Sequence, residues 1–463
     1  TIEKVTTLIG ARRYGDRDGN VGFILTDSRS LCFPEETLFF ALKSERNDGH
    51  NYIPELYRRG VRNFVVSQVP KGYASDYPEA NFLKVVNTLE ALQRLAERHR
   101  DEFNIPIVGI TGSNGKTMVK EWLHQLLSPS MFVTRSPRSY NSQIGVPLSV
   151  WLLNEQTQVG VFEAGISQPG EMLALRDIIQ PTIAVLTYLG AAHQENFESL
   201  EAKCREKIIL FHDADTIVYN GDDKTVSGVV NEYKDYKGEK LFWSFRDTKA
   251  PFFVKNVEKK GNLSIITYIY KGEEDSYSLP FIDEASVTNS IIAAVVSRRL
   301  GLSAEELDKR MALLEPVAMR LEVKEGQHGC TLINDSYNSD INSLDIALDF
   351  MSRRPDHKGR RHTLILSDIF QSGESAKDLY HEVSDLCRKR GVVKFIGIGP
   401  QLCSQSDEIQ ISEKFFFSNV EEFIDSEVFK SLRDEVILLK GARQFGFDQL
   451  TELLVRKVHE TTL

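Results

Sequence analysis

Residues 105–127 read IPIVGITGSNGKTMVKEWLHQLL, an apolar run followed by a turn with two glycines and a run with helical periodicity. The small residues of the turn let successive backbone N–H groups approach an oxyanion, and a following helix adds the positive end of its dipole. Lys116 is placed to reach terminal phosphates, and the Thr117 hydroxyl is placed to bind Mg²⁺. The stretch therefore predicts a nucleotide-phosphate loop; an ordinary glycine turn between a strand and a helix is the alternative.

The bulk composition limits the classes of protein that fit. A chain of 463 residues is long enough for about three domains, each with its own core. The formal net charge of −10, without basic blocks, gives no electrostatic footprint for nucleic acid or an anionic membrane. No apolar run reaches the ~18 residues of a bilayer span, and no secretory signal opens the chain. The chain begins at Thr1, without methionine, as a processed or excised piece would.

Cysteine usage favours a reducing compartment. The five cysteines are odd in number and scattered, and none stands in a CxxC arrangement: Cys32, Cys204, Cys330, Cys387 and Cys403. They indicate reduced thiols of a cytoplasmic protein and argue against a disulfide frame or a zinc site.

Hydrophobic periodicity divides the chain into three α/β units, which we place at residues 1–103, 104–316 and 317–463. In the middle unit, predicted strands alternate with helices, which indicates a doubly wound and mostly parallel sheet. Those strands are 105–110, 131–135, 159–164, 182–187 and 215–219. The third unit repeats the alternation in a second, smaller Rossmann-like sheet, with strands at 330–334, 362–367, 392–398 and 435–439.

Polar residues stand where two strands of the middle unit end, and ligands of such sheets bind beyond the carboxyl ends of the strands. Glu163 ends an apolar strand, so its carboxylate needs a partner; a metal is one candidate, and a role in capping the next helix is the alternative. His193 follows the next strand, and Lys207 lies fourteen residues later. Taken singly, such a histidine is more often an ordinary surface or core residue, and such a lysine is usually solvated.

The motifs taken together resemble the Mur ligase family. The loop TGSNGKT at 111–117 has the form found in that family, and further matches occur in chain order on both sides of it. They are TDSR at 26–29, LFFALKSERNDGHNYI at 38–53, YNSQIGVP at 140–147, AMRLE at 318–322, NDSYNSD at 334–340 and KGAR at 440–443. The resemblance covers nearly the whole chain and implies a central ATP-binding domain between a uridine-binding domain and a Rossmann-like domain.

The resemblance also implies roles for residues outside the phosphate loop. Substrate binding would fall to Ser28 and Arg29 in the first unit, to Asn141 and Ser142 in the second, and to Tyr337 and Asn338 in the third. An arginine suits a diphosphate, because its planar fork bonds two oxygens at once. The nucleotide would be held by the loop residues Thr111, Gly112, Ser113, Asn114, Gly115, Lys116 and Thr117, with Asn289, Arg320 and Asp335.

Cation binding and catalysis follow from the same resemblance. The family implies Mg²⁺ ligands at Thr117, Glu163, His193 and Lys207, with the lysine converted to a carbamate by CO₂ so that its positive charge becomes negative. Lys203 competes for the carbamate position, and spacing favours Lys207. Lys116, His193 and Lys207 are then the candidate catalytic residues. The segment DEASVTN at 283–289 departs from the family pattern and keeps only Asn289, which puts the adenine contacts in doubt.

The function implied is that of an ATP-dependent amide ligase of peptidoglycan precursor synthesis, and hence of cell-wall growth, cell shape and division. The matches are strongest to members that join D-alanyl-D-alanine to UDP-N-acetylmuramoyl-tripeptide through an acyl phosphate, with closure of the third domain over the nucleotide. The last residues, RKVHETTL, resemble the entry to an alanine racemase domain in fused proteins, so we expect such a domain beyond residue 463. The alternatives are folylpolyglutamate synthase, a related ligase, and a non-catalytic ATP-binding switch or scaffold.

Overall fold

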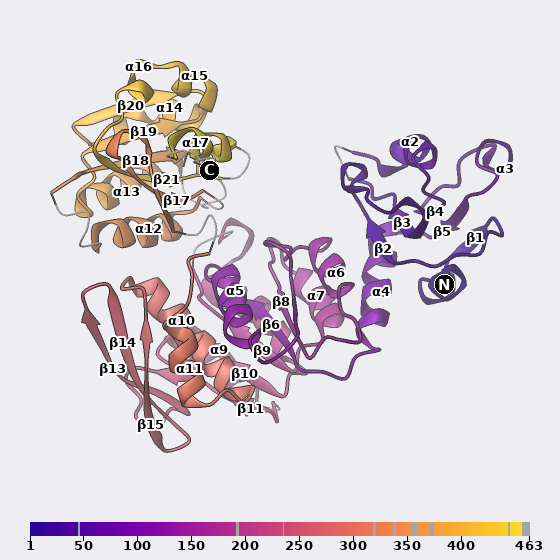
Figure 1. Cartoon of the computed structure of the whole chain (residues 1–463), viewed down its shortest axis with the longest axis horizontal. Helices are drawn as coiled ribbons and strands as arrows, with labels where there is room; N and C mark the ends of the chain where they lie inside the picture. Colours follow the sequence, from indigo (N-terminus) through magenta and orange to yellow (C-terminus); the bar gives the residue numbers. More distant parts are fainter. Residues whose placement is uncertain are drawn as a thin grey trace, which may run out of the picture.

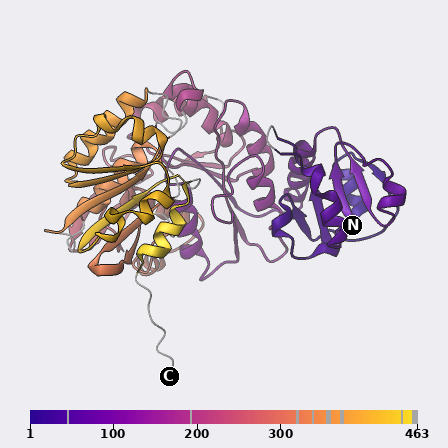
Figure 2. The ribbon, with the colours of Figure 1, turned by 90° about the horizontal axis from the view of Figure 1, so that it is seen from above.

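A computed structural model describes residues 1–44, 47–190, 194–234, 236–317, 321–336, 339–353, 359–369, 375–442 and 445–455. The chain forms three α/β lobes in sequence order, with the N-terminal lobe at one end of the molecule (Figures 1 and 2). The predicted three-domain α/β architecture is confirmed, whereas the residue boundaries assigned to the domains remain a prediction. None of the described helices is long and apolar enough to cross a bilayer.

The N-terminal lobe is built on a five-stranded sheet in the order β1-β5-β4-β3-β2, in which only the β1–β5 pair is antiparallel. The predicted strand at 64–69 stops early, because the Ser67 N–H bonds His50 Nε2 at 3.1 Å instead of continuing the ladder. The strands are β1 (Arg12–Tyr14), β2 (Phe23–Leu25), β3 (Thr37–Phe40), β4 (Asn63–Val66) and β5 (Asn81–Lys84), and the helices are α1 (Ile2–Leu8), α2 (Ile53–Arg58), α3 (Tyr73–Asp76) and α4 (Thr88–Arg100).

Helix α4 is shared between the N-terminal and middle lobes. Leu92 and Leu95 belong to the N-terminal core, whereas Ala96 belongs to the core of the middle lobe. At the end of the helix, the buried Arg100 donates hydrogen bonds to the carbonyls of Ile179 and Gln180, at 3.0 and 3.1 Å. The helix is therefore fixed to both lobes by packing and by charge-assisted hydrogen bonds.

The middle lobe contains the predicted parallel sheet, in the order β11-β10-β9-β6-β8-β7, with a separate hydrophobic core on each face. Such a two-faced arrangement is the doubly wound fold. Its strands are β6 (Ile107–Thr111), β7 (Val133–Arg135), β8 (Val159–Glu163), β9 (Ile183–Leu186), β10 (Thr216–Val218) and β11 (Glu239–Lys240); its helices include α5 (Lys116–Leu127), α6 (Gly145–Val150), α7 (Glu171–Ile179), α8 (Leu200–Ile208) and α9 (Lys224–Glu232).

A second sheet in the middle lobe was absent from the sequence prediction, which placed only a parallel sheet there. It comprises β12 (Trp243–Ser244), β13 (Phe252–Lys260), β14 (Leu263–Tyr270) and β15 (Glu273–Leu279), and the last three strands are antiparallel. Burial alternates along β14, and the buried side packs in one core with helices α10 (Glu284–Arg299) and α11 (Ala304–Met311). The run of β-branched and aromatic residues in 263–270 is the signal that the prediction overlooked.

The C-terminal lobe has a six-stranded sheet in the order β16-β17-β21-β18-β19-β20, parallel except for β16 at one edge. The four predicted strands are present within two residues at each end. The strands are β16 (Glu322–Glu325), β17 (Thr331–Asp335), β18 (Arg361–Ser367), β19 (Lys394–Ile398), β20 (Glu413–Phe417) and β21 (Glu435–Lys440); the helices are α12 (Ile341–Arg353), α13 (Ala376–Lys389), α14 (Pro400–Ser404), α15 (Val420–Asp425), α16 (Glu427–Lys430) and α17 (Phe447–Leu454).

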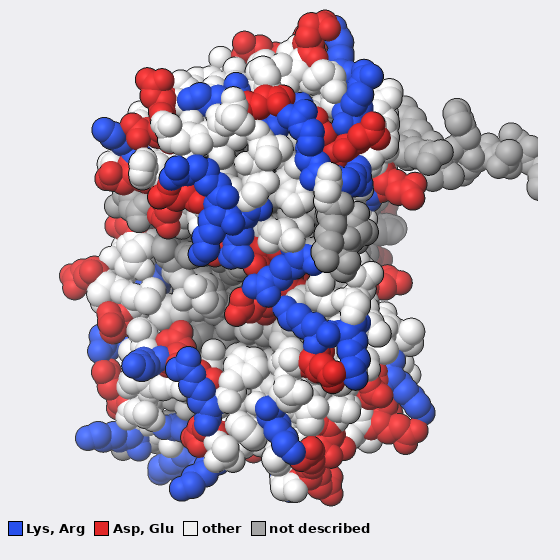
Figure 3. All heavy atoms as spheres, turned by 90° about the vertical axis from the view of Figure 1, so that its left-hand side faces the viewer, with Lys and Arg blue, Asp and Glu red and all other residues white. Residues whose placement is uncertain are grey.

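The C-terminal lobe lies above the β12–β15 side of the middle lobe in Figure 1. Seen from that side, the surface is hollowed between the two lobes, and both basic and acidic side chains lie around the hollow (Figure 3).

Candidate active site

The phosphate loop has the predicted context of strand, turn and helix, and two of its glycines are required by geometry. Gly112 and Gly115 have φ of +142° and +87°, which L side chains rarely adopt. A Cβ at Gly112 would lie 2.1 Å from Thr187 Oγ1, and one at Gly115 would lie 2.5 Å from Asn289 Oδ1. The loop can therefore keep this shape only with glycine at both positions.

Hydrogen bonds to the residues that follow β9 fix the phosphate loop in place. The Ser113 N–H donates to the Tyr188 carbonyl at 2.6 Å, and the Thr187 hydroxyl donates to the Asn114 carbonyl at 2.5 Å. Lys116 Nζ donates to the Gly112 carbonyl at 2.7 Å and so lies over the loop. These bonds fix the loop in shape before any ligand arrives.

Two polar atoms of the loop are buried without a hydrogen-bond partner in the described part of the chain: Thr111 Oγ1 and Asn114 Nδ2. Buried polar groups are normally satisfied, so orphaned ones need an explanation. The Asn114 amide is a donor, and a phosphate oxygen is the acceptor that this class of loop provides for.

Glu163 and Thr117 are brought together, as their predicted shared role requires. The Thr117 hydroxyl donates to Glu163 Oε2 at 3.1 Å and lies 3.0 Å from the Ser139 hydroxyl. The Asn141 amide reaches the same carboxylate oxygen at 3.4 Å. Helix α7, the next in the chain, starts only at Glu171, so the alternative of a helix cap does not describe Glu163.

The second oxygen of the Glu163 carboxylate faces a lysine that the sequence prediction did not include. Lys120 Nζ lies 3.0 Å from Glu163 Oε1, and both side chains are 0% exposed. Oε1 nevertheless accepts no hydrogen bond of good geometry in the described structure. The signal for Lys120 was its position on α5, three residues after Thr117 and hence on the same helical face.

The donor set fits a divalent cation. A hydroxyl at the start of α5 and a carboxylate at the end of β8 are ligands that Mg²⁺ accepts, and the cation usually keeps several waters and binds substrate phosphates as well. Thr117 and Glu163 would supply the protein oxygens. His193 lies outside the described residues, and the described ones contain no cluster of three or more His, Cys, Asp or Glu.

Lys207 and Lys203 both lie under the loop, on α8. Lys207 is buried, and its Nζ lies 3.4 Å from the Gly112 carbonyl. Burial, and then the neighbouring cations Lys116 and Lys203, lower the pKa of Lys207 well below its usual value. Burial likewise lowers the pKa of Lys203 to about 8. Lys207 thus lies beside the loop, and its role as a carbamate and cation ligand stays a prediction.

Segment 283–289 is ordered around the start of α10. Asp283 caps the helix by accepting from the Ser286 N–H at 2.8 Å, and burial raises the pKa of Asp283. Asn289 lies against Gly115, and its amide contacts Met118 Sδ at 3.2 Å. Asn289 therefore supports the phosphate loop, and a contact with adenine remains a prediction.

The candidate residues of the C-terminal lobe are described only in part. Asp335 ends β17 and forms a buried ion pair of 2.6 Å with Lys440, its register partner at the end of β21. Arg320, Tyr337 and Asn338 lie outside the described residues. The KGAR turn thus contributes Lys440 as the charge partner of Asp335.

The candidate uridine site lies in the N-terminal lobe, away from the phosphate loop (Figure 1). The Arg29 side chain is 87% exposed and pairs with Asp27 at 2.6 Å, while the Ser28 carbonyl accepts from Arg59 at 2.8 Å. Ser142, a predicted substrate residue, instead accepts from the Gly145 N–H at 3.1 Å at the start of α6. An anionic ligand could bind the exposed Arg29 guanidinium if the ion pair with Asp27 broke. Breaking it costs little free energy, because the pair is exposed to solvent.

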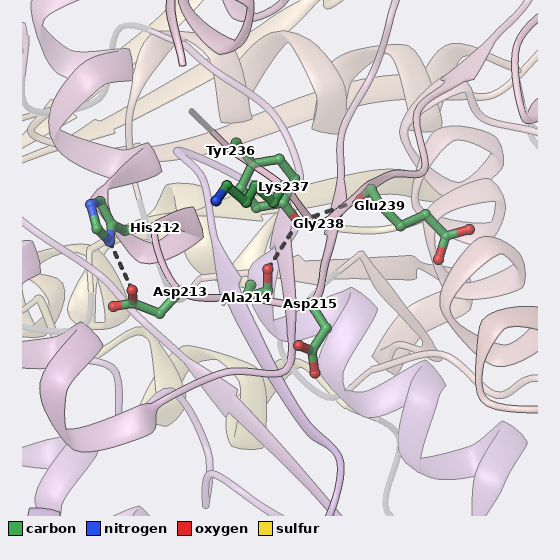
Figure 4. A pocket seen from close by; sticks show the side chains of 8 residues that line it. All are labelled: His212, Asp213, Ala214, Asp215, Tyr236, Lys237, Gly238 and Glu239. Carbon is green, nitrogen blue, oxygen red and sulfur yellow. Dashed lines mark hydrogen bonds and ion pairs between the residues drawn. The ribbon is translucent and has the colours of Figure 1, made fainter. Parts of the chain in front are cut away.

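A separate open groove of about 540 Å³ lies at the amino ends of β10 and β11 (Figure 4). His212 Nδ1 lies 2.9 Å from Asp213 Oδ1, and the Tyr236 hydroxyl donates to the Ala214 carbonyl at 2.9 Å. Ligands of open α/β sheets bind at the opposite, carboxyl end of the strands, so this groove is distinct from the candidate active site. Its lining comprises His212, Asp213, Ala214, Asp215, Tyr236, Lys237, Gly238 and Glu239.

Known sequences are similar to this chain in its middle domain and beyond it. Residues 110–297 match the Mur ligase middle domain. A UDP-N-acetylmuramoyl-tripeptide–D-alanyl-D-alanine ligase of Bacillus subtilis is 28% identical over 78% of this chain and 76% of its own. The ligase of the same name from Buchnera aphidicola is 26% identical over 99% of this chain and 98% of its own.

Solved structures share the fold over most of the chain. A MurF from Acinetobacter baumannii matches with a TM-score of 0.82 and 22% identity, over 98% of both chains. A MurF ligase from Thermotoga maritima, solved with ADP, matches with a TM-score of 0.76 and 22% identity, over 93% of this chain and 96% of its own. A folylpolyglutamate synthase from Mycobacterium tuberculosis matches with a TM-score of 0.60 and 13% identity, over 79% of this chain and 93% of its own.

The relatives named above are ligases and give no support to the expected racemase fusion. The expectation rested on residues 456–463, which lie outside the described residues, and it is not carried further. The match of the middle domain and the similarity along the rest of the chain agree with the order of motifs in the sequence. Residues 110–297 thus match the Mur ligase middle domain, and the chain is similar to the ligases named above along almost its whole length.

Proposed function

We propose that this protein is an ATP-dependent ligase that joins D-alanyl-D-alanine to UDP-N-acetylmuramoyl-tripeptide, in the cytoplasm and in peptidoglycan precursor synthesis. The observation that carries the proposal is the 3.1 Å contact between Thr117, at the start of the phosphate-loop helix, and the buried Glu163 carboxylate. The similarity to relatives of that name along almost the whole chain supports the choice of substrates.

The reaction would proceed in two steps. A carboxylate oxygen of the tripeptide attacks the γ-phosphorus of ATP, which forms an acyl phosphate and releases ADP. The amine of the dipeptide then attacks the acyl carbon, loses a proton, and expels inorganic phosphate as the amide bond forms. Both steps bring anionic groups together, so the loop N–H groups and the Lys116 ammonium would act by offsetting negative charge on the transferred phosphoryl group.

Mg²⁺ held by Thr117 and Glu163, with His193 as a further candidate, would supply Lewis-acid stabilisation of the phosphates. Glu163 is anchored for this role, because the Thr117 hydroxyl and the Asn141 amide fix one oxygen. The other oxygen accepts no well-aligned hydrogen bond in the described structure.

Lys207 would act as a carbamate. Only a neutral amine attacks CO₂, in a step that forms an N–C bond and releases a proton. The low pKa of Lys207, caused by burial and by Lys116 and Lys203, supports this modification. The anionic product would also offset the positive charges of those two lysines.

The outer lobes would hold the two ends of the reactants. Ser28 and Arg29 are proposed to bind the uridine diphosphate, with Asn141, Ser142, Tyr337 and Asn338 nearer the peptide. Asn289, Arg320 and Asp335 are proposed to bind the nucleotide, which requires the C-terminal lobe, from residue 317, to close on the middle lobe (104–316). Small-angle scattering that does not change on adding an ATP analogue with the UDP substrate would contradict closure.

The function is tested by phosphate release from ATP and Mg²⁺ with UDP-N-acetylmuramoyl-tripeptide, with and without D-alanyl-D-alanine. We expect release only when both substrates are present, and loss of release in Lys116→Ala. Release without the dipeptide would instead indicate an ATP-binding switch. Release with a folate and glutamate in place of these substrates would indicate a folylpolyglutamate synthase.

A further inference from the structure

Lys120 is a buried charge that none of the proposed steps uses. Its side chain is 0% exposed on α5, one turn after Lys116, with Nζ 3.0 Å from Glu163 Oε1. Burying an ammonium is costly unless it is paired and hydrogen-bonded. A lysine at this position, touching the carboxylate proposed to bind a cation, therefore calls for a reason.

The contacts of Lys120 extend beyond Glu163. Its ammonium donates to the Arg138 carbonyl and lies 3.1 Å from Glu121 Oε1. The other oxygen of Glu121 accepts from Arg135 Nε at 3.0 Å. An ammonium has three donors, so Lys120 keeps two partners in place if the Glu163 carboxylate turns toward another cation.

We propose that Lys120 is a positioning residue that serves as an internal counter-cation for Glu163: it holds the carboxylate beside Thr117 and competes with the divalent cation for it. The divalent cation then binds well only when nucleotide phosphates add negative charge. This inference rests on the cation site of the proposed function.

The physical basis is the sign and distance of the charges. A cation bound to Glu163 would lie within a few ångströms of the Lys120 ammonium, with little water between them to screen the repulsion. The same ammonium offsets the charge of Glu163 when the site holds no cation, so the carboxylate stays ordered. Lys120 would thereby make cation binding depend on nucleotide binding, which is a coupling between two ligands.

A structural role alone predicts something different. If the pair only fastened α5 to β8, removing Lys120 would lower stability and leave cation affinity unchanged or reduced. Competition predicts that removing the positive charge raises the affinity of the nucleotide-free protein for a divalent cation.

The test is a titration of the full chain with Mn²⁺ in the absence of nucleotide, following the free ion by electron paramagnetic resonance. We expect Lys120→Gln to bind Mn²⁺ at least about tenfold more tightly than wild type, because a repulsive charge is removed. Lys120→Arg, which keeps the charge, should bind no more tightly than wild type. An unchanged or weaker affinity in folded Lys120→Gln, or a tighter one in Lys120→Arg, would overturn the proposal.

Lys394→Gln is the matched control. Lys394 is buried and pairs with Glu435 at the same 3.0 Å, but in the C-terminal sheet. This variant should lose stability without any gain in Mn²⁺ affinity, and an equal gain would show that Lys120 has no specific role. If Lys120→Gln unfolds, Mn²⁺ should restore its helical circular dichroism, and failure to do so would count against competition.

Mn²⁺ titrations with an ATP analogue, and of Glu163→Gln, distinguish a failure of this inference from a failure of the proposed function. If wild type binds Mn²⁺ with an ATP analogue while Lys120→Gln gains nothing without nucleotide, only the role of Lys120 fails. If no Mn²⁺ binds in any state, and Glu163→Gln changes nothing, the cation site itself fails and this inference fails with it.

Discussion

Two buried lysine–carboxylate pairs have the same length and lie in different lobes. Lys120–Glu163 and Lys394–Glu435 are both separated by 3.0 Å, and all four side chains are almost wholly buried. Around Glu435 every oxygen is used: Oε1 pairs with Lys394 and Oε2 accepts from the Thr363 hydroxyl. Around Glu163, Oε1 has the ammonium nearby but no well-aligned hydrogen bond among the described residues.

The two pairs also lie at opposite ends of their sheets. Lys394 and Glu435 are the first residues of β19 and β21, whereas Glu163 is the last residue of β8. Ligands of parallel sheets bind beyond the carboxyl ends of the strands. The same kind of pair can thus satisfy both carboxylate oxygens at one end of a sheet and, at the other, leave one oxygen without a well-aligned hydrogen bond, where the cation is proposed to bind.

The largest effect is expected for Glu435→Ala. Among the described residues, the change leaves the buried Lys394 ammonium with Glu413, at 3.4 Å, as its one carboxylate partner. Breaking a buried pair in this way should lower the free energy of unfolding by about 3–5 kcal/mol. Urea denaturation would measure the loss, and the turnover of the remaining folded protein should be unchanged. A stable but inactive variant would remove the distinction between the two pairs.

The complementary change is Glu163→Gln, which keeps the shape of the side chain and removes its charge. Substrate-dependent phosphate release should fall about 100-fold or more, because a proposed cation ligand at the transferred phosphoryl group is lost. Urea denaturation of the same variant reports on its folding. Full activity in Glu163→Gln would mean that the carboxyl-end pair is structural too.

Lys203 extends the comparison to pH, because it is a buried lysine whose ammonium donates to a backbone carbonyl, that of Gly190. Its pKa is about 8 in the folded protein and near the ordinary 10.5 when unfolded, so the unfolded state binds more protons between these values. The free energy of unfolding should therefore rise from pH 8 to pH 10, by on the order of 2 kcal/mol from this group. Below pH 8 both states carry the proton and the group adds no pH dependence.

Lys203→Met provides the reference for that measurement. Denaturation midpoints of wild type and variant, compared at several pH values from 7 to 10, isolate the contribution of Lys203 from those of other titrating groups. Parallel profiles would show that the lysine keeps its ordinary pKa.

The smallest effect is expected at an exposed pair. Lys255 on β13 and Glu274 on β15 lie 2.8 Å apart across the intervening strand β14, with both side chains about half exposed. Lys255→Ala should change the free energy of unfolding by less than about 0.5 kcal/mol, because solvent screens such pairs. A loss as large as that of Glu435→Ala would mean that burial does not separate these classes of ion pair.

Most of the parallel strands and the phosphate loop could be predicted, because apolar runs and Gly-Lys-Thr spacing are local signals. Lys120 shares a helical face with Thr117, but this local pattern does not predict that it is buried, because lysines on a helix usually face solvent. Its burial depends on Glu163, which lies at the end of β8. The support of Gly115 by Asn289 joins positions 174 residues apart in the chain. The antiparallel sheet did have a local signal, the β-branched and aromatic residues of 263–270, which the prediction did not use.

Helix α4 has a consequence for substrate choice if the proposed function holds. Its 13 residues span about 20 Å, and both of its ends are fixed, one in the N-terminal core and the other by Arg100 in the middle lobe. The helix would therefore set the distance between the site for the uridine end of the substrate and the site where its carboxylate is phosphorylated. Each residue of an extended peptide adds only about 3.3 Å. The length of the substrate, as well as its side chains, would thus decide whether its carboxylate reaches the phosphate loop.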